Sequence, residues 1–225
     1  MTSKSDFRIL LVYPDLPMMM TPSLALALFT RILREEGFRV ELFDTTHYIS
    51  DEPSLSELRY ESLQVRSFSA KELGISPIPV HRLLRDFRRK VETFKPHVLM
   101  FSVVENTLEQ ALAMLDAVRD AAIPTLFGGV LAMAAPDRLL SYDEVRAVCP
   151  GEGEHVVREF ARRVFEGRSI EETPGVWVKR ADGSIIRNPP SLLPDINKTI
   201  PDWSLVEPRK FNRAMGGRVF RMVPI

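Results

Sequence analysis

The sequence predicts an α/β fold of the flavodoxin-like, doubly wound type, with a five-stranded parallel sheet covered by helices on both faces. Short apolar segments alternate with longer segments whose apolar residues recur every three or four positions, and this rhythm runs through residue 167. Glycine or proline closes most of these segments. Because each pair of parallel strands needs a right-handed crossover, we expect the strand order 2-1-3-4-5.

The first unit combines two strands and one helix. "FRILLVY" at residues 7–13 is short, branched and nearly all apolar, which is typical of a buried strand. After the loop "PDLPMMMTP", a helix is expected from Ser23, a favourable N-cap, to Glu36, with Gly37 as its terminator. "FRVELFD" at residues 38–44 predicts the second strand.

The middle of the chain begins with a long excursion. Residues 45–78 have weak periodicity and are expected to form a long loop with at most one short helix. A helix is predicted at 80–94, followed by the buried strand "HVLMFSV" at 97–103. Asn106 or Thr107 then caps the next helix.

The last two units are shorter. "PTLFGG" at residues 124–129 predicts the fourth strand, and a short helix is expected near 136–141. "EVRAVC" at 144–149 predicts the fifth strand, and the helix at 154–166 stops at Gly167. We expect residues 1–168 to form the α/β domain.

After Gly167 the alternation of strand-like and helix-like segments ends. "GVWVKRADGSIIRNPP" predicts a β-hairpin with Asp182-Gly183 at its turn, and the proline-rich "SLLPDINKTIPDW" predicts an extended linker across a surface. Residues 169–225 are therefore expected to be a hairpin and a linker.

Composition excludes several classes of protein. Thirty basic residues balance 30 acidic ones, so no overall charge attracts nucleic acid or anionic lipid. One cysteine cannot form an internal disulfide, and the N-terminus has too few apolar residues for a signal peptide. No apolar run approaches the roughly 20 residues of a membrane span. We expect a cytoplasmic protein without membrane insertion.

The functional site should lie beyond the carboxyl ends of the strands. The segments there are "YPDLPMMMTPS", "SVVENT", "GGVLAMAAP" and "PGEGEH", and none holds a cluster of ionisable groups. Such a rim suits a broad, largely apolar ligand rather than acid–base chemistry. A receiver domain, a flavin mononucleotide site and a Rossmann dinucleotide site are excluded, because their acidic or glycine-rich motifs are missing from these loops.

Four of these motifs occur in a characteristic order. "EEGFRVELFD", "KPHVLMFSVVENT", "FGGV" and "PGEGE", followed by "GVWVKRADGSIIRNPP", resemble the cobalamin-binding N-terminal domain of cobalamin-dependent radical S-adenosylmethionine (SAM) enzymes. This family includes methyltransferases and anaerobic magnesium-protoporphyrin monomethyl ester cyclases. The resemblance implies cobalamin as the cofactor, with the [4Fe-4S] cluster and S-adenosylmethionine in a C-terminal radical SAM domain, acting in cis or in trans.

The same resemblance implies which residues contact cobalamin. Glycines would let the backbone approach the corrin side arms and the nucleotide tail, and Glu152 or Glu154 would accept hydrogen bonds. The implied set is Asp15, Pro17, Met18, Met19, Met20, Thr21, Ser102, Val103, Val104, Thr107, Gly128, Gly129, Val130, Leu131, Gly151, Glu152, Gly153 and Glu154. Two simpler interpretations stay open: "PGEGE" as a tight turn with helix-capping carboxylates, and Thr107 as a helix cap.

The loop after the first strand departs from the mutase motif D-x-H-x-x-G. It reads Asp15-Leu16-Pro17-Met18-Met19-Met20 and contains no histidine. The resemblance therefore implies base-off cobalamin without an imidazole ligand. A methionine thioether is a soft candidate ligand, but packing against the corrin or the core is the simpler role for these side chains.

No residue is expected to be catalytic in this chain. The family's CxxxCxxC motif normally follows a stretch like "GRVFRMVPI", where this sequence ends, and its one cysteine, Cys149, is interpreted as a small buried strand residue. The histidines are interpreted as structural or surface residues. The alternative function is a standalone cobalamin carrier or sensor that acts through a partner protein.

Overall fold

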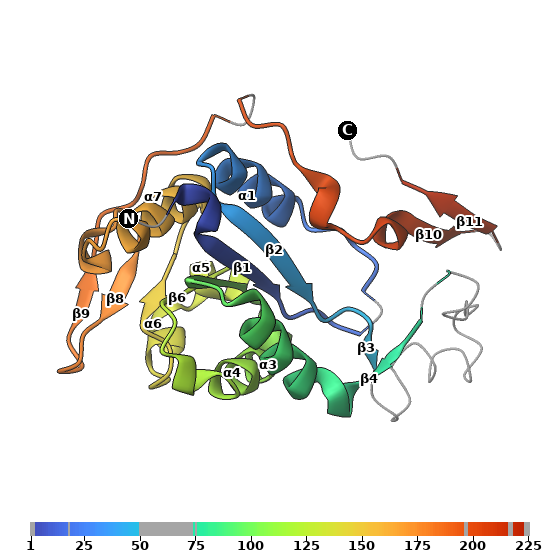
Figure 1. Ribbon diagram of the computed structural model, residues 1–225, viewed down its shortest axis with the longest axis horizontal. Coiled ribbons are helices and arrows are strands. Elements are labelled where there is room, and N and C mark those ends of the chain that lie inside the picture. The colour runs from blue at the N-terminus through green and yellow to red at the C-terminus, as the bar shows by residue number, and fades with distance from the viewer. Residues whose placement is uncertain are drawn as a thin grey trace.

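The structure, a computed structural model, describes residues 3–17, 19–49, 74, 76–195, 198–215 and 218–222. A seven-stranded sheet runs through the molecule with helices on both sides, and the chain returns across the outside of the helices near its C-terminus (Figure 1). The strand order is β2-β1-β5-β6-β7-β8-β9. The strands are β1 (Arg8–Tyr13), β2 (Arg39–Asp44), β5 (Val98–Ser102), β6 (Thr125–Gly128), β7 (Ala147–Val148), β8 (Trp177–Lys179) and β9 (Ile185–Arg187).

The first five strands in this order confirm the predicted 2-1-3-4-5 topology. All their pairings are parallel, from Ile9 beside Val40 to Phe127 beside Val148. The predicted hairpin is present as β8 and β9, but it does not stand apart from the domain. β8 pairs antiparallel with β7 and extends the same sheet by two strands.

Two hydrophobic cores lie on the two faces of the sheet. The helices are α1 (Leu24–Glu35), α3 (Leu83–Phe94), α4 (Leu108–Asp116), α5 (Val130–Ala134), α6 (Pro136–Leu140) and α7 (Glu154–Phe165). One core joins α3, α4, α5 and α6 to the sheet, and Phe101 stacks on Phe127 within it at 4.9 Å. The other core joins α1 and α7 to the opposite face. This two-sided burial of apolar area stabilises the sheet.

The helix ends follow the predicted signals. The Ser23 hydroxyl accepts a hydrogen bond from the Leu26 amide at 3.4 Å, which caps α1. Gly37 adopts a φ of 88° and Gly167 a φ of 66°, so each terminates its helix in a conformation that favours glycine.

Other local elements differ from expectation. α5 was not predicted; it begins directly after Gly129 and precedes the expected helix α6. β7 is shorter than the predicted 144–149. β3 (Tyr48–Ile49) and β4 (Ile78–Pro79) pair with each other at the two ends of the long excursion. The short helix expected within 45–78 would fall on residues that lie outside the described part of the chain.

The C-terminal segment runs over α7 and α1, as the linker prediction requires, and can be followed in orange and red in Figure 1. The Asp202 amide donates to the Ala27 carbonyl of α1 at 2.9 Å, and Arg34 pairs with Asp202 at 2.7 Å. The segment ends in an unpredicted hairpin, β10 (Asn212–Met215) and β11 (Arg218–Arg221). None of the helices in the described ranges has the length and apolar character that crossing a bilayer requires.

Candidate functional site

The carboxyl ends of β1, β5, β6 and β7 meet at one rim of the sheet, as expected for parallel neighbours. A cavity of about 120 Å³ opens there between the sheet and the helices α1 and α7. Its lining is mostly apolar and comprises Leu11, Ala25, Leu26, Phe29, Met100, Phe101, Ser102, Leu126, Gly128, Gly129, Met133, Cys149, Gly151, Glu152, Gly153 and Val157. The structure thus brings together Ser102, Glu152 and four predicted glycines, Gly128, Gly129, Gly151 and Gly153.

Gly129 is required by the backbone itself. Its φ of 95° and ψ of −177° lie in a region that only glycine adopts readily. A Cβ at this position would lie 2.6 Å from the Val103 carbonyl oxygen and 2.7 Å from the Val103 nitrogen. The Val103 amide donates to the Gly128 carbonyl at 2.9 Å, so the ends of β5 and β6 are locked together where they enter the rim.

Gly153 and Gly151 serve different purposes. A Cβ on Gly153 would overlap the ring of Phe29, so this glycine lets α1 pack closely on the turn before α7. A Cβ on Gly151 would meet no atom within 4 Å. Gly151 is exposed and a Cβ there would enter open space, whereas Gly153 and Gly129 allow close approach of protein to protein.

Cys149 follows β7 and lines the same cavity. Its thiol donates to the Gly151 carbonyl at 3.4 Å, which holds the turn "PGEG". Burial raises the pKa of this thiol to about 11, so it stays protonated at neutral pH. The sequence interpretation of Cys149 as a small buried residue agrees with this placement.

Glu154 begins α7 and is half-buried beside the cavity-lining turn. Its Oε2 atom is buried and finds no hydrogen-bond partner among the described residues. A buried acceptor without a donor costs free energy, so this oxygen is available for a ligand donor. Glu152, in contrast, is exposed.

Three predicted residues hold the protein itself together: Thr107 through hydrogen bonds, and Val103 and Leu131 through burial in the core. The Thr107 hydroxyl donates to the Val104 carbonyl at 3.1 Å and accepts from the Val104 amide at 3.2 Å. These bonds close the 3-10 turn Glu105–Thr107, and although Thr107 occupies the N-cap position of α4, its side chain makes no capping bond to that helix. Val103 and Leu131 are buried in the core on the α3–α4 face, whereas Val104 and Val130 are exposed.

Asp15 and Thr21 are likewise engaged by protein rather than placed in the cavity. Asp15 is 7% exposed, and its Oδ2 accepts from the Thr46 hydroxyl at 2.8 Å and from Lys210 Nζ at 3.1 Å. Burial raises the pKa of the Asp15 carboxyl, and the Lys210 charge opposes that shift. The Thr21 hydroxyl accepts from Arg213 at 2.9 Å.

The remaining described residues of the loop after β1 are apolar, and two of them, Pro17 and Met19, are exposed. Met20 is buried and Met19 exposed, while Pro17 lies next to Leu16 at the turn that follows Asp15; Met18 lies outside the described residues. No histidine occurs in this loop. Elsewhere, His97 accepts a hydrogen bond from the Arg8 amide at 2.9 Å, and burial lowers its pKa.

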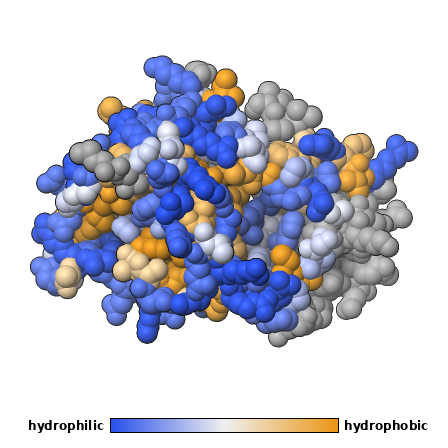
Figure 2. Space-filling model, viewed as in Figure 1, coloured by the Kyte–Doolittle hydropathy of each residue, from blue (hydrophilic) through white to orange (hydrophobic). Residues whose placement is uncertain are grey.

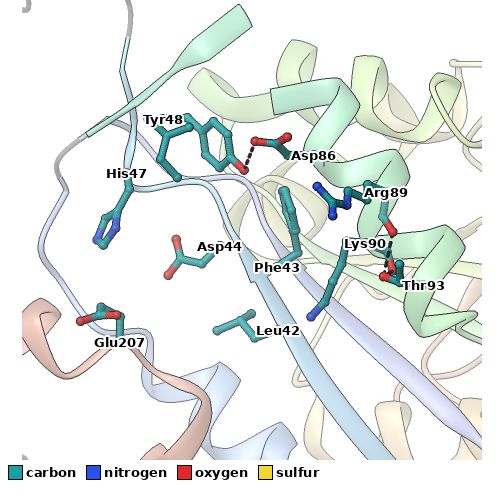
Figure 3. A pocket seen from close by; sticks show the side chains of 11 residues that line it. Leu42, Phe43, Asp44, His47, Tyr48, Asp86, Arg89, Lys90, Thr93 and Glu207 are labelled. Carbon is teal, nitrogen blue, oxygen red and sulfur yellow. Dashed lines mark hydrogen bonds between the residues drawn. The ribbon is translucent and has the colours of Figure 1, made fainter. Parts of the chain in front are cut away.

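A second hollow, of about 500 Å³, lies at the end of β2 beside α3 and holds none of the predicted site residues (Figure 3). Charges of both signs line it, and several pair with protein: Lys90 with Glu41 at 2.6 Å and Asp44 with Lys210 at 2.7 Å. The described residues contain no group of histidine, cysteine or carboxylate side chains arranged for a metal ion.

Sequence reasoning missed the helix residues that line the cavity, among them Ala25 and Phe29 of α1, Met133 of α5 and Val157 of α7. The four-residue spacing of Ala25 and Phe29 placed them on one helix face, but nothing in the sequence said that this face meets the "PGEG" turn.

Comparison with known proteins gives one family and several structures. Residues 19–161 match the B12 binding domain. Over 86 residues, the chain is 36% identical to the tryptophan 2-C-methyltransferase of Streptomyces laurentii, which covers 36% of this chain and 14% of that protein.

Two solved structures share the fold. The radical S-adenosylmethionine methyltransferase TsrM from Kitasatospora setae, with cobalamin and a [4Fe-4S] cluster bound, superposes with a TM-score of 0.60 at 21% identity, covering 90% of this chain and 32% of that one. The cobalamin-dependent S-adenosylmethionine radical enzyme OxsB, with aqua-cobalamin and S-adenosylmethionine bound, gives 0.53 at 16% identity, covering 83% and 22%. The chain therefore spans about a third or less of the length of these relatives.

Proposed function

The chain belongs to the B12 binding domain family, and from that premise we propose that its rim cavity receives the nucleotide tail of cobalamin while the corrin lies over the rim. The single observation that carries this proposal is the apolar, glycine-lined cavity at the carboxyl ends of β5, β6 and β7, between the sheet and the pair α1 and α7. The benzimidazole ring at the end of the tail is flat and apolar and can enter such a slot without displacing a charged side chain, whereas the ribose and phosphate of the tail are polar and would stay at its mouth.

The residues present fit the tail in character. Gly128, Gly129 and Gly151 present bare backbone to the cavity, and Ser102 adds a hydroxyl. Glu154, whose buried Oε2 lacks a partner among the described residues, does not line the cavity but follows the lining residue Gly153 directly. The volume of about 120 Å³ is below the roughly 300–1,000 Å³ of typical ligand pockets. Phe29 is the half-buried side chain at the cavity whose ring would have to turn away for the tail to enter.

The base-off form follows from this placement. A benzimidazole base held in the cavity is not on cobalt, and the loop at residues 14–23 offers no imidazole to replace it. We infer that the lower face of the cofactor meets the apolar side chains of this loop. Met19 is the exposed methionine among its described residues, and Met20 is buried. In this proposal their role is packing, and no thioether ligand is required.

The wider role is that of the cofactor-binding part of a cobalamin-dependent radical SAM enzyme, a methyltransferase or an oxidative cyclase. When bound, cobalamin supplies a cobalt centre that can carry a methyl group. The residues of this chain bind and orient the cofactor and exclude water from it. The [4Fe-4S] cluster and S-adenosylmethionine belong to a radical SAM domain, since Cys149 is the only cysteine in the sequence and is buried.

Titration with hydroxocobalamin tests the proposal. The purified protein is expected to take up about one equivalent, with the visible spectrum of the base-off form. Gly151→Phe is expected to block uptake because Gly151 lines the cavity and a large ring there would obstruct the tail, and Gly151→Ala is the matched control because its Cβ would meet no atom within 4 Å. No uptake by the unmodified protein would refute cobalamin binding, and a base-on spectrum would refute the placement of the tail.

A further inference from the structure

Lys210 is a buried charge that contacts Asp15, one of the predicted site residues. The residue is 1% exposed, although it belongs to the C-terminal segment that runs over the surface of α1. Its Nζ lies 2.7 Å from Asp44 Oδ2 and 3.1 Å from Asp15 Oδ2, and 4.8 Å from the centre of the Tyr13 ring. A buried ammonium group is tolerated only with such partners.

The partners of Lys210 all come from the rim. Tyr13 ends β1, Asp15 opens the loop that follows it, and Asp44 ends the neighbouring strand β2. Asp15 Oδ1 in turn accepts from the Leu16 amide at 2.9 Å, which fixes the first turn of the loop. One lysine from near the C-terminus thus holds the base of the loop that follows β1.

A second contact reaches the other end of the same loop. Arg213, three residues after Lys210, donates to the Thr21 hydroxyl at 2.9 Å. The Trp203 ring packs edge-on against Phe211 at 5.5 Å, so a residue that precedes Lys210 in the segment is packed against the residue that follows it. The C-terminal segment therefore touches the loop close to where it begins and close to where it ends.

We propose that Lys210 is a positioning residue that holds the loop at residues 14–23 in the shape required beneath cobalamin, so that docking of the C-terminal segment and binding of the cofactor are coupled. This inference rests on the proposed function. A buried ion pair adds little net stability over an apolar pair of the same size, so its better-supported role is to select one arrangement among several. In this protein, Lys210 would select one position of the C-terminal segment against the loop that follows β1.

The competing explanation is that Lys210 merely fastens the segment to the domain. Arg34 provides the matched control, because it pairs with Asp202 at 2.7 Å and with the Ser204 hydroxyl at 2.6 Å. Arg34→Met loosens the same segment on α1 without touching the loop. A fastening role predicts equal effects of the two changes; a positioning role does not.

The experiment compares Lys210→Met, Lys210→Arg and Arg34→Met by two measurements. Without cofactor, amide hydrogen exchange of peptides covering residues 14–20 is expected to accelerate about 100-fold in Lys210→Met. This factor corresponds to the smallest loss of stability that breaking a buried ion pair typically causes. The dissociation constant of hydroxocobalamin is expected to rise about 10-fold in Lys210→Met. Lys210→Arg should restore both in part, and Arg34→Met should change neither.

Failure to fold is addressed by the double variant Asp15→Asn/Lys210→Met, which removes one buried carboxylate with the lysine. It is expected to fold, to exchange rapidly in the loop and to bind cobalamin as weakly as Lys210→Met. Unchanged loop exchange in the Lys210 variants, or equal effects from Arg34→Met, would overturn the inference. If the unmodified protein binds no cobalamin, the proposed function fails and with it the coupling, whereas the exchange measurement still decides whether Lys210 orders the loop.

Discussion

Two halves of one rim are built in opposite ways. Around β5, β6 and β7 the rim consists of glycines, small side chains and an apolar cavity, and the buried oxygen of Glu154 lacks a protein donor among the described residues. At the ends of β1 and β2 the rim consists of buried charges, and Asp15 is bonded to both Thr46 and Lys210. The first half therefore has open space and an unpaired polar group for a ligand, whereas the polar groups of the second half are already paired within the protein.

This difference shows that position at the rim does not by itself make a residue a ligand contact. Parallel strands deliver all their loops to the same edge, but hydrogen-bond partners decide which groups are free to bind. The C-terminal segment also contains both engaged and unengaged side chains. Its hairpin β10–β11 exposes the apolar side chains of Val219 and Phe220, and hydrophobic atoms lie at its position on the right of Figure 2. Close to it, Lys210 is buried among its partners.

The largest expected effect is on the charged half. Lys210→Met leaves Asp15 and Asp44 without their cation, and we expect a loss of about 3–5 kcal/mol in the free energy of unfolding. Denaturant unfolding measures the loss, and the double variant with Asp15→Asn should recover much of it. A loss below 1 kcal/mol for Lys210→Met would show that this half of the rim does not depend on its buried charges.

The glycine half is tested by Gly129→Ala. The added Cβ meets the Val103 backbone in a conformation that only glycine adopts readily, so we expect a loss of about 2–3 kcal/mol. Gly128→Ala is the control, because its Cβ would make an ordinary 3.9 Å contact with the Phe101 carbonyl oxygen. Equal stability of the two variants would contradict the account of Gly129.

A smaller effect concerns the pairing of α1 with α7 near their C-terminal ends. Glu36, at the end of α1, accepts from Arg162 of α7 at 2.7 and 2.8 Å. Burial alone would raise the pKa of Glu36, but Arg162 and Lys4 outweigh it and hold the pKa below its usual range. A lowered pKa gives stability that is present above the unfolded value and lost as pH falls through the folded one.

Glu36→Gln should therefore flatten the acid side of the stability profile. We expect a loss of about 1 kcal/mol at neutral pH, after allowance for the exposure of Arg162, and little difference from the unmodified protein at pH 3. Thermal unfolding across pH 3–7 measures this. A variant with an unchanged acid slope would show that the pairing of α1 with α7 is not electrostatic.

The last prediction concerns the reactivity of the Cys149 thiol in the cavity and involves no change in stability. Because burial raises the pKa of Cys149 to about 11, a thiol reagent is expected to label it far more slowly than free cysteine at pH 8. Bound cobalamin should slow labelling further, since Cys149 lines the cavity. Labelling at the rate of free cysteine would mean that the cavity wall is open to solvent.

The sequence could predict the sheet order, the main helices and the glycine loops, because apolar periodicity and helix terminators are local signals. It could not separate Asp15 and Thr21 from true cavity residues. Their partners, Lys210 and Arg213, lie more than 190 residues away in the chain. The role of Phe29 was hidden for the same reason, because its contact with Gly153 joins two helices that are distant in sequence.

The most direct test of the central claim compares cobalamin with cobinamide, which has the corrin but lacks the nucleotide tail. If the rim cavity holds the tail, the protein should bind cobalamin at least about 10-fold more tightly, a difference of about 1.4 kcal/mol. Gly151→Phe should remove this preference by weakening cobalamin binding alone. Equal affinity of the unmodified protein for the two compounds would contradict the account.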